Sequence, residues 1–159
     1  GFKKYMEEHY GCKVALRSPA HITLAPPFSM SVQKQDELDD HLSAFASSEK
    51  SFTIRLQNFD NFKPRVIFVN VLPDTPLLQI KQRLDDYLFP LKNFSFKKED
   101  RPFHPHITIA NRDLRKSDFH KAWAHFSKLR YEAEFTASSI SLLRHNKKEW
   151  EIAKEWAPG

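Results

Sequence analysis

Glycine and cysteine are scarce in this sequence, with three and one copies among 159 residues. The single cysteine, Cys12, cannot close an internal disulfide, which is typical of a protein in a reducing cytosol. No Gly/Ser-rich or low-complexity stretch interrupts the chain, so we expect one domain over residues 1–159. No apolar run approaches the roughly 20 residues that cross a bilayer, and the first residues lack the apolar stretch of a secretory signal. We therefore expect a cytoplasmic protein without a membrane partner.

Apolar and basic side chains, in contrast, are plentiful. Hydrophobic residues make up 40% of the chain and aromatic residues 13%, with 14 phenylalanines, so burial of apolar surface can offset the entropy lost on ordering the chain. The formal net charge of +5 and the pI near 9.3 favour an anionic partner such as a phosphate ester or a nucleic acid. Solvated surface lysines would give the same balance, so the charge alone defines no site.

Hydrophobic periodicity predicts a mixture of helices and strands. Apolar residues at helical spacing, such as Leu38, Leu42 and Phe45, indicate helices, and alternating apolar residues indicate strands. Gly11 should end the first helix, and Thr75 is the expected N-cap of the third. The predicted helices cover 2–10, 35–48, 76–88 and 117–129, and the predicted strands cover 20–25, 51–59, 65–71, 104–110, 131–136, 139–145 and 149–154.

The tripeptide His-Ile-Thr occurs twice, at 21–23 and 106–108, and both copies continue with an aliphatic residue and an alanine. Each copy holds the same place in a repeated order of helix, motif strand, helix and strand pair. This order predicts two similar lobes of roughly 1–73 and 74–159, each presenting one copy. If the motif strands are neighbours around a pseudo-twofold axis, their polar side chains converge on one cleft.

The spacing within each triplet has a chemical consequence. Successive side chains of a strand point to opposite faces, so His21 shares a face with Thr23, and His106 shares one with Thr108. Two imidazoles on opposite sides of one phosphorus atom can act as base and acid in an in-line displacement, without a metal or other cofactor. The two threonine hydroxyls can donate hydrogen bonds to the non-bridging phosphate oxygens and stabilise the transition state.

On these motifs the sequence resembles the 2H phosphoesterase superfamily, the LigT-like or 2′-5′ RNA ligase group. Its signature is two His-x-Thr/Ser motifs followed by an apolar residue, here HITL at 21–24 and HITI at 106–109. The surrounding SPAHITLAPPF and FHPHITIANRD and the closing ISLLRHNKKEWEIAKEW add to the resemblance. It implies a bilobal α+β fold with antiparallel sheets, helices outside and a central cleft. Family members usually begin with a strand ahead of the first helix, so we expect a leading segment to be missing here.

The resemblance also implies a function. We expect a metal-independent phosphodiesterase, or a related 2′-5′ RNA ligase-like enzyme, that acts as a monomer on an RNA end, a nucleotide 2′,3′-cyclic phosphate or a 2′-5′ linkage. His21, Thr23, His106 and Thr108 are the expected catalytic residues. The sequence leaves open which histidine is the base, which substrate is physiological, and whether the direction is hydrolysis or ligation.

Four further residues are candidates for binding the substrate. Arg112, just beyond the second motif, could meet the phosphate or a ribose, and Arg65 could border the cleft. Phe28 and Phe103 could stack a nucleobase, although core packing is the stronger default for both aromatic rings.

Two alternatives compete with this interpretation. His104 and His106 have a spacing that suits zinc with His21 as a third ligand, but no acidic residue or cysteine beside either motif completes the set. A binding module could keep the cleft and grasp RNA ends by charge and stacking, without chemistry. The presence of all four motif residues favours an enzyme over such a module.

Overall fold

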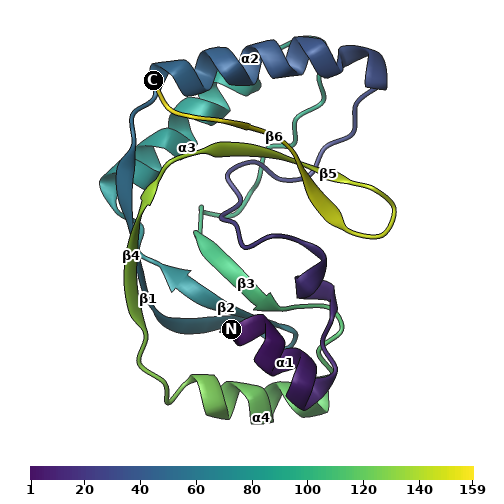
Figure 1. The fold of residues 1–159 in the computed structure, drawn as a ribbon, viewed down its shortest axis with the longest axis vertical. Coiled ribbons are helices and arrows are strands. Elements are labelled where there is room, and N and C mark those ends of the chain that lie inside the picture. The colour runs from purple at the N-terminus through teal and green to yellow at the C-terminus, as the bar shows by residue number, and fades with distance from the viewer.

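The computed structural model describes residues 1–159 and has the α+β architecture that the resemblance implies (Figure 1). The α-helices are α1 (Phe2–Tyr10), α2 (Gln35–Ser48), α3 (Thr75–Leu88) and α4 (Lys116–Phe126), with short 3-10 helices η1 (Val14–Arg17) and η2 (Val32–Lys34). The strands are β1 (Phe52–Phe62), β2 (Val66–Val71), β3 (His106–Ala110), β4 (Glu132–Ala137), β5 (Ile140–His145) and β6 (Trp150–Trp156). None of the helices combines the length and the apolar character needed to span a membrane.

The strands form one four-stranded antiparallel sheet and a separate two-stranded hairpin. The sheet has the order β3-β2-β1-β4, and β5 pairs with β6. Figure 1 shows the sheet curving along one side of the molecule, with α1 and α4 at one end and α2 and α3 at the other. The second motif strand, β3, is therefore an edge strand, and it begins near the middle of the molecule.

The helices group across the two halves of the sequence. Tyr5 of α1 stacks on His125 of α4, with ring centroids 4.4 Å apart and ring planes 8° apart. Arg83 of α3 donates hydrogen bonds of 2.9 and 3.1 Å from Nε to the buried carboxylate of Glu49, which directly follows α2. Each end of the molecule therefore contains helices from both halves of the sequence, and the pairing of β4 with β1 joins the two halves in one sheet. Strands from both expected lobes, 1–73 and 74–159, belong to the same four-stranded sheet.

Most predicted elements are confirmed, and their boundaries have local causes. α1 ends where Gly11 takes the left-handed conformation with φ 68°, as the sequence predicts. The expected N-cap of α3 at Thr75 is wrong, because Asp74 is the N-cap and Thr75 is the first helical residue. The Asp74 carboxylate makes no capping hydrogen bond and instead accepts bonds of 2.8 and 2.9 Å from Arg55 of β1.

The strand expected at 20–25, around the first motif, does not form. This segment pairs with no strand, and prolines flank it on both sides. Proline has no N–H to donate to a ladder, which confines it to strand ends and edges. The carbonyl of Leu24 accepts a hydrogen bond from Lys81 Nζ instead. Ile22 and Leu24 still pack against the core, so the segment is anchored although it is not a strand.

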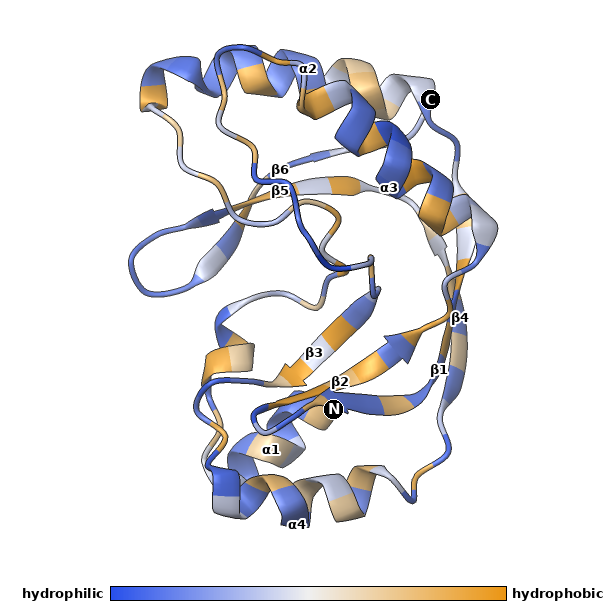
Figure 2. Ribbon diagram, turned by 180° about the vertical axis from the view of Figure 1, so that it is seen from behind, coloured by the Kyte–Doolittle hydropathy of each residue, from blue (hydrophilic) through white to orange (hydrophobic).

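One apolar core connects the two ends of the molecule. A cluster of 21 buried residues includes side chains from all the α-helices and from β1, β2 and β3. Figure 2 shows the matching pattern, with hydrophobic residues interspersed along otherwise hydrophilic helices. On β3, Ile109 is 2% exposed within this core, whereas His106 and Thr108 are half-buried on the other face of the strand. The core therefore supports the second motif from behind.

Candidate active site

Both motif histidines are held by the same kind of hydrogen bond. Nδ1 of His21 lies 2.6 Å from the carbonyl oxygen of Pro19, and Nδ1 of His106 lies 2.6 Å from the carbonyl oxygen of His104. In each case the acceptor belongs to the residue two positions earlier. A carbonyl can only accept, so Nδ1 of each ring is the donor nitrogen. Each Nε2 is left free to take or give a proton.

His106 sits against two phenylalanines. The ring centroid of Phe68 in β2 lies 4.9 Å from that of the imidazole, and the ring centroid of Phe62 in β1 lies 5.2 Å from it. Burial is the main cause that lowers the pKa of His106 below its usual value, and the charges of His104 and His21 lower this pKa further. These causes outweigh the opposing effect of the hydrogen bond to the His104 carbonyl. The surroundings therefore favour the neutral imidazole.

The two motifs face a common space. His21, Thr23 and Thr108 line one cleft of about 1210 Å³, and His106 lies on the same side of β3 as Thr108. His106 itself is not among the residues that line the cleft, and a charge on His21 is one of the causes that lower its pKa. Figures 1 and 2 show the segment between α1 and α2 crossing the middle of the molecule beside the start of β3. The segment that carries the first motif therefore lies beside the second motif strand, although it forms no strand itself.

The structure divides the four predicted binding residues. Arg112 and Phe28 line the cleft, and Phe28 packs edge-on against Phe96 with ring centroids 4.7 Å apart. Arg65 is exposed in the turn between β1 and β2, and Phe103 packs against the core. Neither Arg65 nor Phe103 is part of the cleft lining. The structure thus brings two of the four candidates to the cleft.

Sequence reasoning missed three residues beside the motifs. Phe62 and Phe68 contact His106 because β1, β2 and β3 pair in this register, and no local pattern marks them. Asn111 directly follows β3 and lines the cleft, and its buried side-chain oxygen has no hydrogen-bond donor in the protein. A buried acceptor of this kind needs a donor. Its place directly after the second motif is the one sequence signal that points to it.

The zinc alternative requires His21, His104 and His106 to converge on one ion. No three His, Cys, Asp or Glu side chains in the chain are arranged so that they could hold a metal ion. Zinc needs at least three protein ligands in a tetrahedral arrangement, so these histidines do not fit a zinc site.

Two solved structures share this fold. TT0787 of Thermus thermophilus matches with a TM-score of 0.72 at 18% identity, over 98% of this chain and 86% of its own. LigT of Escherichia coli in complex with 3′-AMP matches with a TM-score of 0.67 at 19% identity, over 99% of this chain and 91% of its own. Likeness at this level of identity establishes the fold, which is that of the LigT-like 2H phosphoesterases.

The sequence profile of the 2′-5′ RNA ligase superfamily matches residues 3–149. Because the match covers nearly the whole sequence, the chain belongs to the 2′-5′ RNA ligase superfamily, as the twin motifs predict. Two proteins named "Putative phosphoesterase", from Bacillus pumilus and Bacillus licheniformis, are 29% and 28% identical to it over 96 and 99 residues. These matches cover 59% of this chain and 53% of each relative, so the chain spans about half the length of the curated relatives it matches.

Proposed function

We propose that this protein is a phosphodiesterase that acts, without a metal cofactor, on the 2′,3′-cyclic phosphate of an RNA end or nucleotide, or on a related 2′-5′ linkage. His21 and His106 are its general acid and base, and Thr23 and Thr108 bind the phosphate. The relatives support the reaction class and the kind of ligand. Two of them are named phosphoesterases, and LigT was solved with a nucleotide, 3′-AMP.

The proposed reaction needs one base and one acid. A water oxygen attacks the phosphorus and the bond from phosphorus to O3′ breaks, which leaves a 2′-phosphate and a 3′-hydroxyl. One imidazole takes a proton from the water, and the other, initially protonated, gives a proton to O3′. The two rings end with exchanged protonation states and return through solvent. Because each Nδ1 holds its proton against a carbonyl, each ring changes state at Nε2.

Groups around the two histidines suit a ribose phosphate. The hydroxyls of Thr23 and Thr108 can donate to the non-bridging oxygens as charge develops on them. Arg112 can pair with the phosphate, and the buried oxygen of Asn111 can accept a hydrogen bond from a ribose hydroxyl. Phe28 can stack a base at the side of the cleft.

The observation that carries the proposal is that the two motif imidazoles are anchored in the same way. Both rings use Nδ1 for a backbone carbonyl at 2.6 Å. A histidine that serves packing alone has no need of a free Nε2, whereas acid/base catalysis requires one on each side of the phosphorus. His21, Thr23 and Thr108 line the same cleft, and His106 shares a face of β3 with Thr108.

Replacing either histidine tests the proposal. We expect His21→Ala and His106→Ala each to lower kcat by at least about 100-fold, since each removes a proton transfer. The assay follows a panel of nucleoside 2′,3′-cyclic phosphates and 2′-5′ dinucleotides in EDTA, with products separated by chromatography. His120→Ala, which removes an exposed histidine from α4, is the matched control and should keep full activity.

Two results would count against this function. A variant at His21 or His106 that retains most of the activity would refute the role of that residue. A wild-type protein that binds nucleotides but turns none over, with binding that survives both substitutions, would be a binding module and not an enzyme.

A further inference from the structure

The cleft is larger than one nucleotide needs. Its volume of about 1210 Å³ exceeds the roughly 300–1,000 Å³ of ordinary small-molecule sites. Its lining extends beyond the motifs to Arg17 of η1 and to both strands of the β5–β6 hairpin. Figure 1 shows this hairpin reaching across the open side of the molecule, opposite the segment that contains η1. The cleft therefore has a second region, bounded by the hairpin and η1.

Two basic side chains of this second region have no ion-pair partner. Six Lys or Arg residues line the whole cleft, against two Glu. Arg17 and Lys148 are exposed, and neither takes part in an ion pair, whereas Lys81 and Arg83 on α3 both pair with carboxylates. A groove with unpaired basic side chains along it is suited to the phosphates of a single-stranded nucleic acid.

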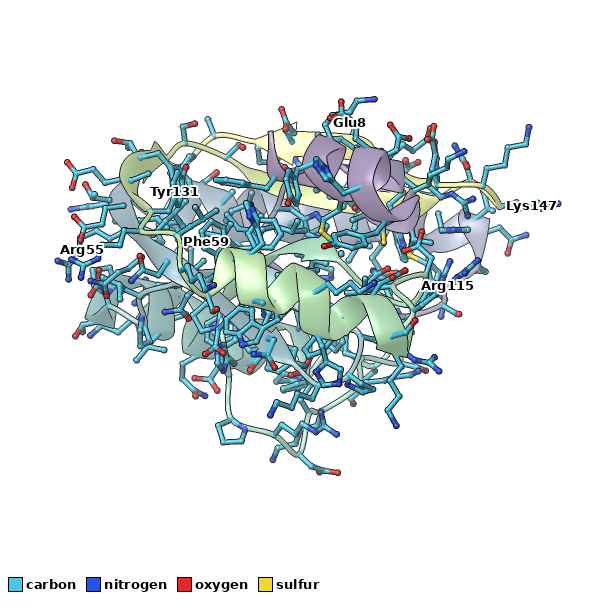
Figure 3. The ribbon with its side chains drawn as sticks, turned by 90° about the horizontal axis from the view of Figure 1, so that it is seen from below. Glu8, Arg55, Phe59, Arg115, Tyr131 and Lys147 are labelled. Carbon is cyan, nitrogen blue, oxygen red and sulfur yellow. The ribbon has the colours of Figure 1, made fainter.

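The hairpin turn holds its basic residues in a defined arrangement. Asn146 Oδ1 accepts a hydrogen bond of 3.0 Å from the backbone N–H of Lys148, which is the geometry of an Asx turn. Arg144 pairs with Glu151 across the two strands at 3.0 Å. Figure 2 shows the turn as hydrophilic, and Figure 3 shows Lys147 at the edge of the molecule, extending outward. The turn thus presents Lys147 and Lys148 from a fixed backbone.

An aromatic ring lies beside the basic turn. Trp150, the first residue of β6, lines the cleft and is only partly buried. His145, its register partner on β5, packs edge-on against the indole with ring centroids 5.2 Å apart. A partly exposed indole next to unpaired basic side chains suits a stacked base, because every base offers a flat face to an aromatic ring.

We propose that Arg17, Lys148 and Trp150 form an RNA platform for the nucleotides that precede the reacting phosphate. Arg17 and Lys148 contact backbone phosphates, and Trp150 stacks a base. This inference rests on the proposed function and narrows its substrate class to single-stranded RNA ends of several nucleotides, in preference to free mononucleotides.

Kinetics on substrates of two lengths test the RNA platform. The substrates are adenosine 2′,3′-cyclic phosphate and a pentaadenylate that ends in the same cyclic phosphate. We expect the wild-type protein to have the higher kcat/KM on the pentanucleotide. The double variant Arg17→Ala/Lys148→Ala should lower the ratio of kcat/KM on the pentanucleotide to kcat/KM on the mononucleotide by at least about tenfold. Only the longer substrate reaches both side chains.

A matched variant controls for overall charge. Lys121→Ala/Lys128→Ala removes the same two charges from α4 and the residues after it, outside the cleft lining. We expect it to leave the ratio of kcat/KM values unchanged.

Binding without turnover gives a second measurement. A 5′-labelled pentaadenylate with a 3′-phosphate is titrated by fluorescence anisotropy at several KCl concentrations. Each phosphate contact to a single strand contributes about 0.7 to the slope of log K against log salt, so the Arg17→Ala/Lys148→Ala variant should flatten this slope by about 1.4. Trp150→Ala should weaken binding, and Trp150→Phe, which keeps an aromatic ring, should restore most of it.

The outcomes separate the RNA platform from the chemistry. Equal kcat/KM values on both substrates, with an unchanged salt slope in the double variant, would overturn the platform and leave the phosphodiesterase intact. If the protein turned over neither substrate while the salt slope of binding still depended on Arg17 and Lys148, that result would support the platform and refute the proposed phosphodiesterase activity. If Lys121→Ala/Lys128→Ala flattened the salt slope of binding as much as Arg17→Ala/Lys148→Ala does, the RNA would be attracted by net charge alone. That result would also overturn the platform.

Discussion

Thr108 differs from a valine by one hydroxyl in place of a methyl group, which allows a test of transition-state binding at a single atom. Thr108→Val keeps the β-branched shape that suits β3 and removes the donor to the phosphate. We expect kcat to fall about 10²–10³-fold with little change in KM, as for loss of one oxyanion-hole donor. Steady-state kinetics on a cyclic phosphate measure this, and Thr108→Ser should recover most of the rate. A valine variant with wild-type kcat would mean that Thr108 serves only the strand.

The phenylalanines against His106 should control how it titrates. Phe62 is 40% exposed and lies edge-on to the imidazole, so Phe62→Ala opens one side of the ring to water without emptying the core. Because burial is the main cause that lowers the pKa of His106, hydration should raise this pKa toward its usual value. NMR titration of the His106 Cε1–H signal measures the change. Phe89→Ala, at a similar 39% exposure after α3, is the control and should leave the titration unchanged.

The same substitution can show which proton His106 transfers. A base must be deprotonated to act, so its pKa sets the acidic limb of kcat/KM, whereas the pKa of an acid sets the basic limb. A raised pKa in Phe62→Ala moves the limb that belongs to His106 to higher pH and leaves the other in place. We expect the acidic limb to move, because the surroundings favour the neutral ring. A profile in which neither limb moves would contradict a role for His106 in proton transfer.

At the scale of one element, the β-bulge in β1 depends on Asn58. Leu56 and Phe59 of β1 each pair with a residue of β2. Between these two pairs, β1 has two residues, Gln57 and Asn58, whereas β2 has only one. Asn58 takes φ 59° there, and its Oδ1 accepts a hydrogen bond of 2.9 Å from the backbone N–H of Tyr131. Asparagine tolerates this left-handed conformation better than other non-glycine residues.

Substitutions at Asn58 should separate the conformational cost from the hydrogen bond. Asn58→Ala loses both and should destabilise the fold by about 2–3 kcal/mol. Asn58→Gly loses only the bond, because glycine adopts positive φ freely, and should cost about 1 kcal/mol. Urea unfolding gives both values. Equal losses in the two variants would mean that the backbone conformation at Asn58 contributes nothing.

The elements also show where sequence reasoning succeeds and where it stops. The spacing of Leu38, Leu42 and Phe45 predicts α2 because an amphipathic helix is decided locally, by one face that must be buried. The strand expected at 20–25 fails because alternation cannot reveal whether a neighbouring strand will supply the ladder. The contact of Phe62 with His106 is likewise a property of strand register. The motif residues are therefore readable from the sequence, and their surroundings are not.

At the scale of the whole molecule, the site exists because distant segments are tied together. Asp113, which follows the second motif, accepts hydrogen bonds of 2.6 and 2.9 Å from the backbone N–H groups of Lys13 and Val14. Lys3 donates a hydrogen bond of 2.9 Å to the carbonyl of Ser18, close to the first motif. These contacts hold the connection that carries His21 against α1 and the residues after β3. The geometry of two histidines therefore depends on the fold as one unit.

If the fold is one unit, both ends of the molecule should unfold together. The buried cluster of 21 residues joins α1 and α4 to α2 and α3 through the sheet, so neither end keeps an intact core when the other is lost. Trp123 on α4 reports on one end, and Trp156 at the end of β6 reports on the other. Two variants that each keep one of these tryptophans, with the others changed to phenylalanine, should give the same urea midpoint by fluorescence, coincident with far-UV circular dichroism. Separate midpoints would mean two independently stable lobes, and the coupling of the two motifs would then rest on the linking contacts alone.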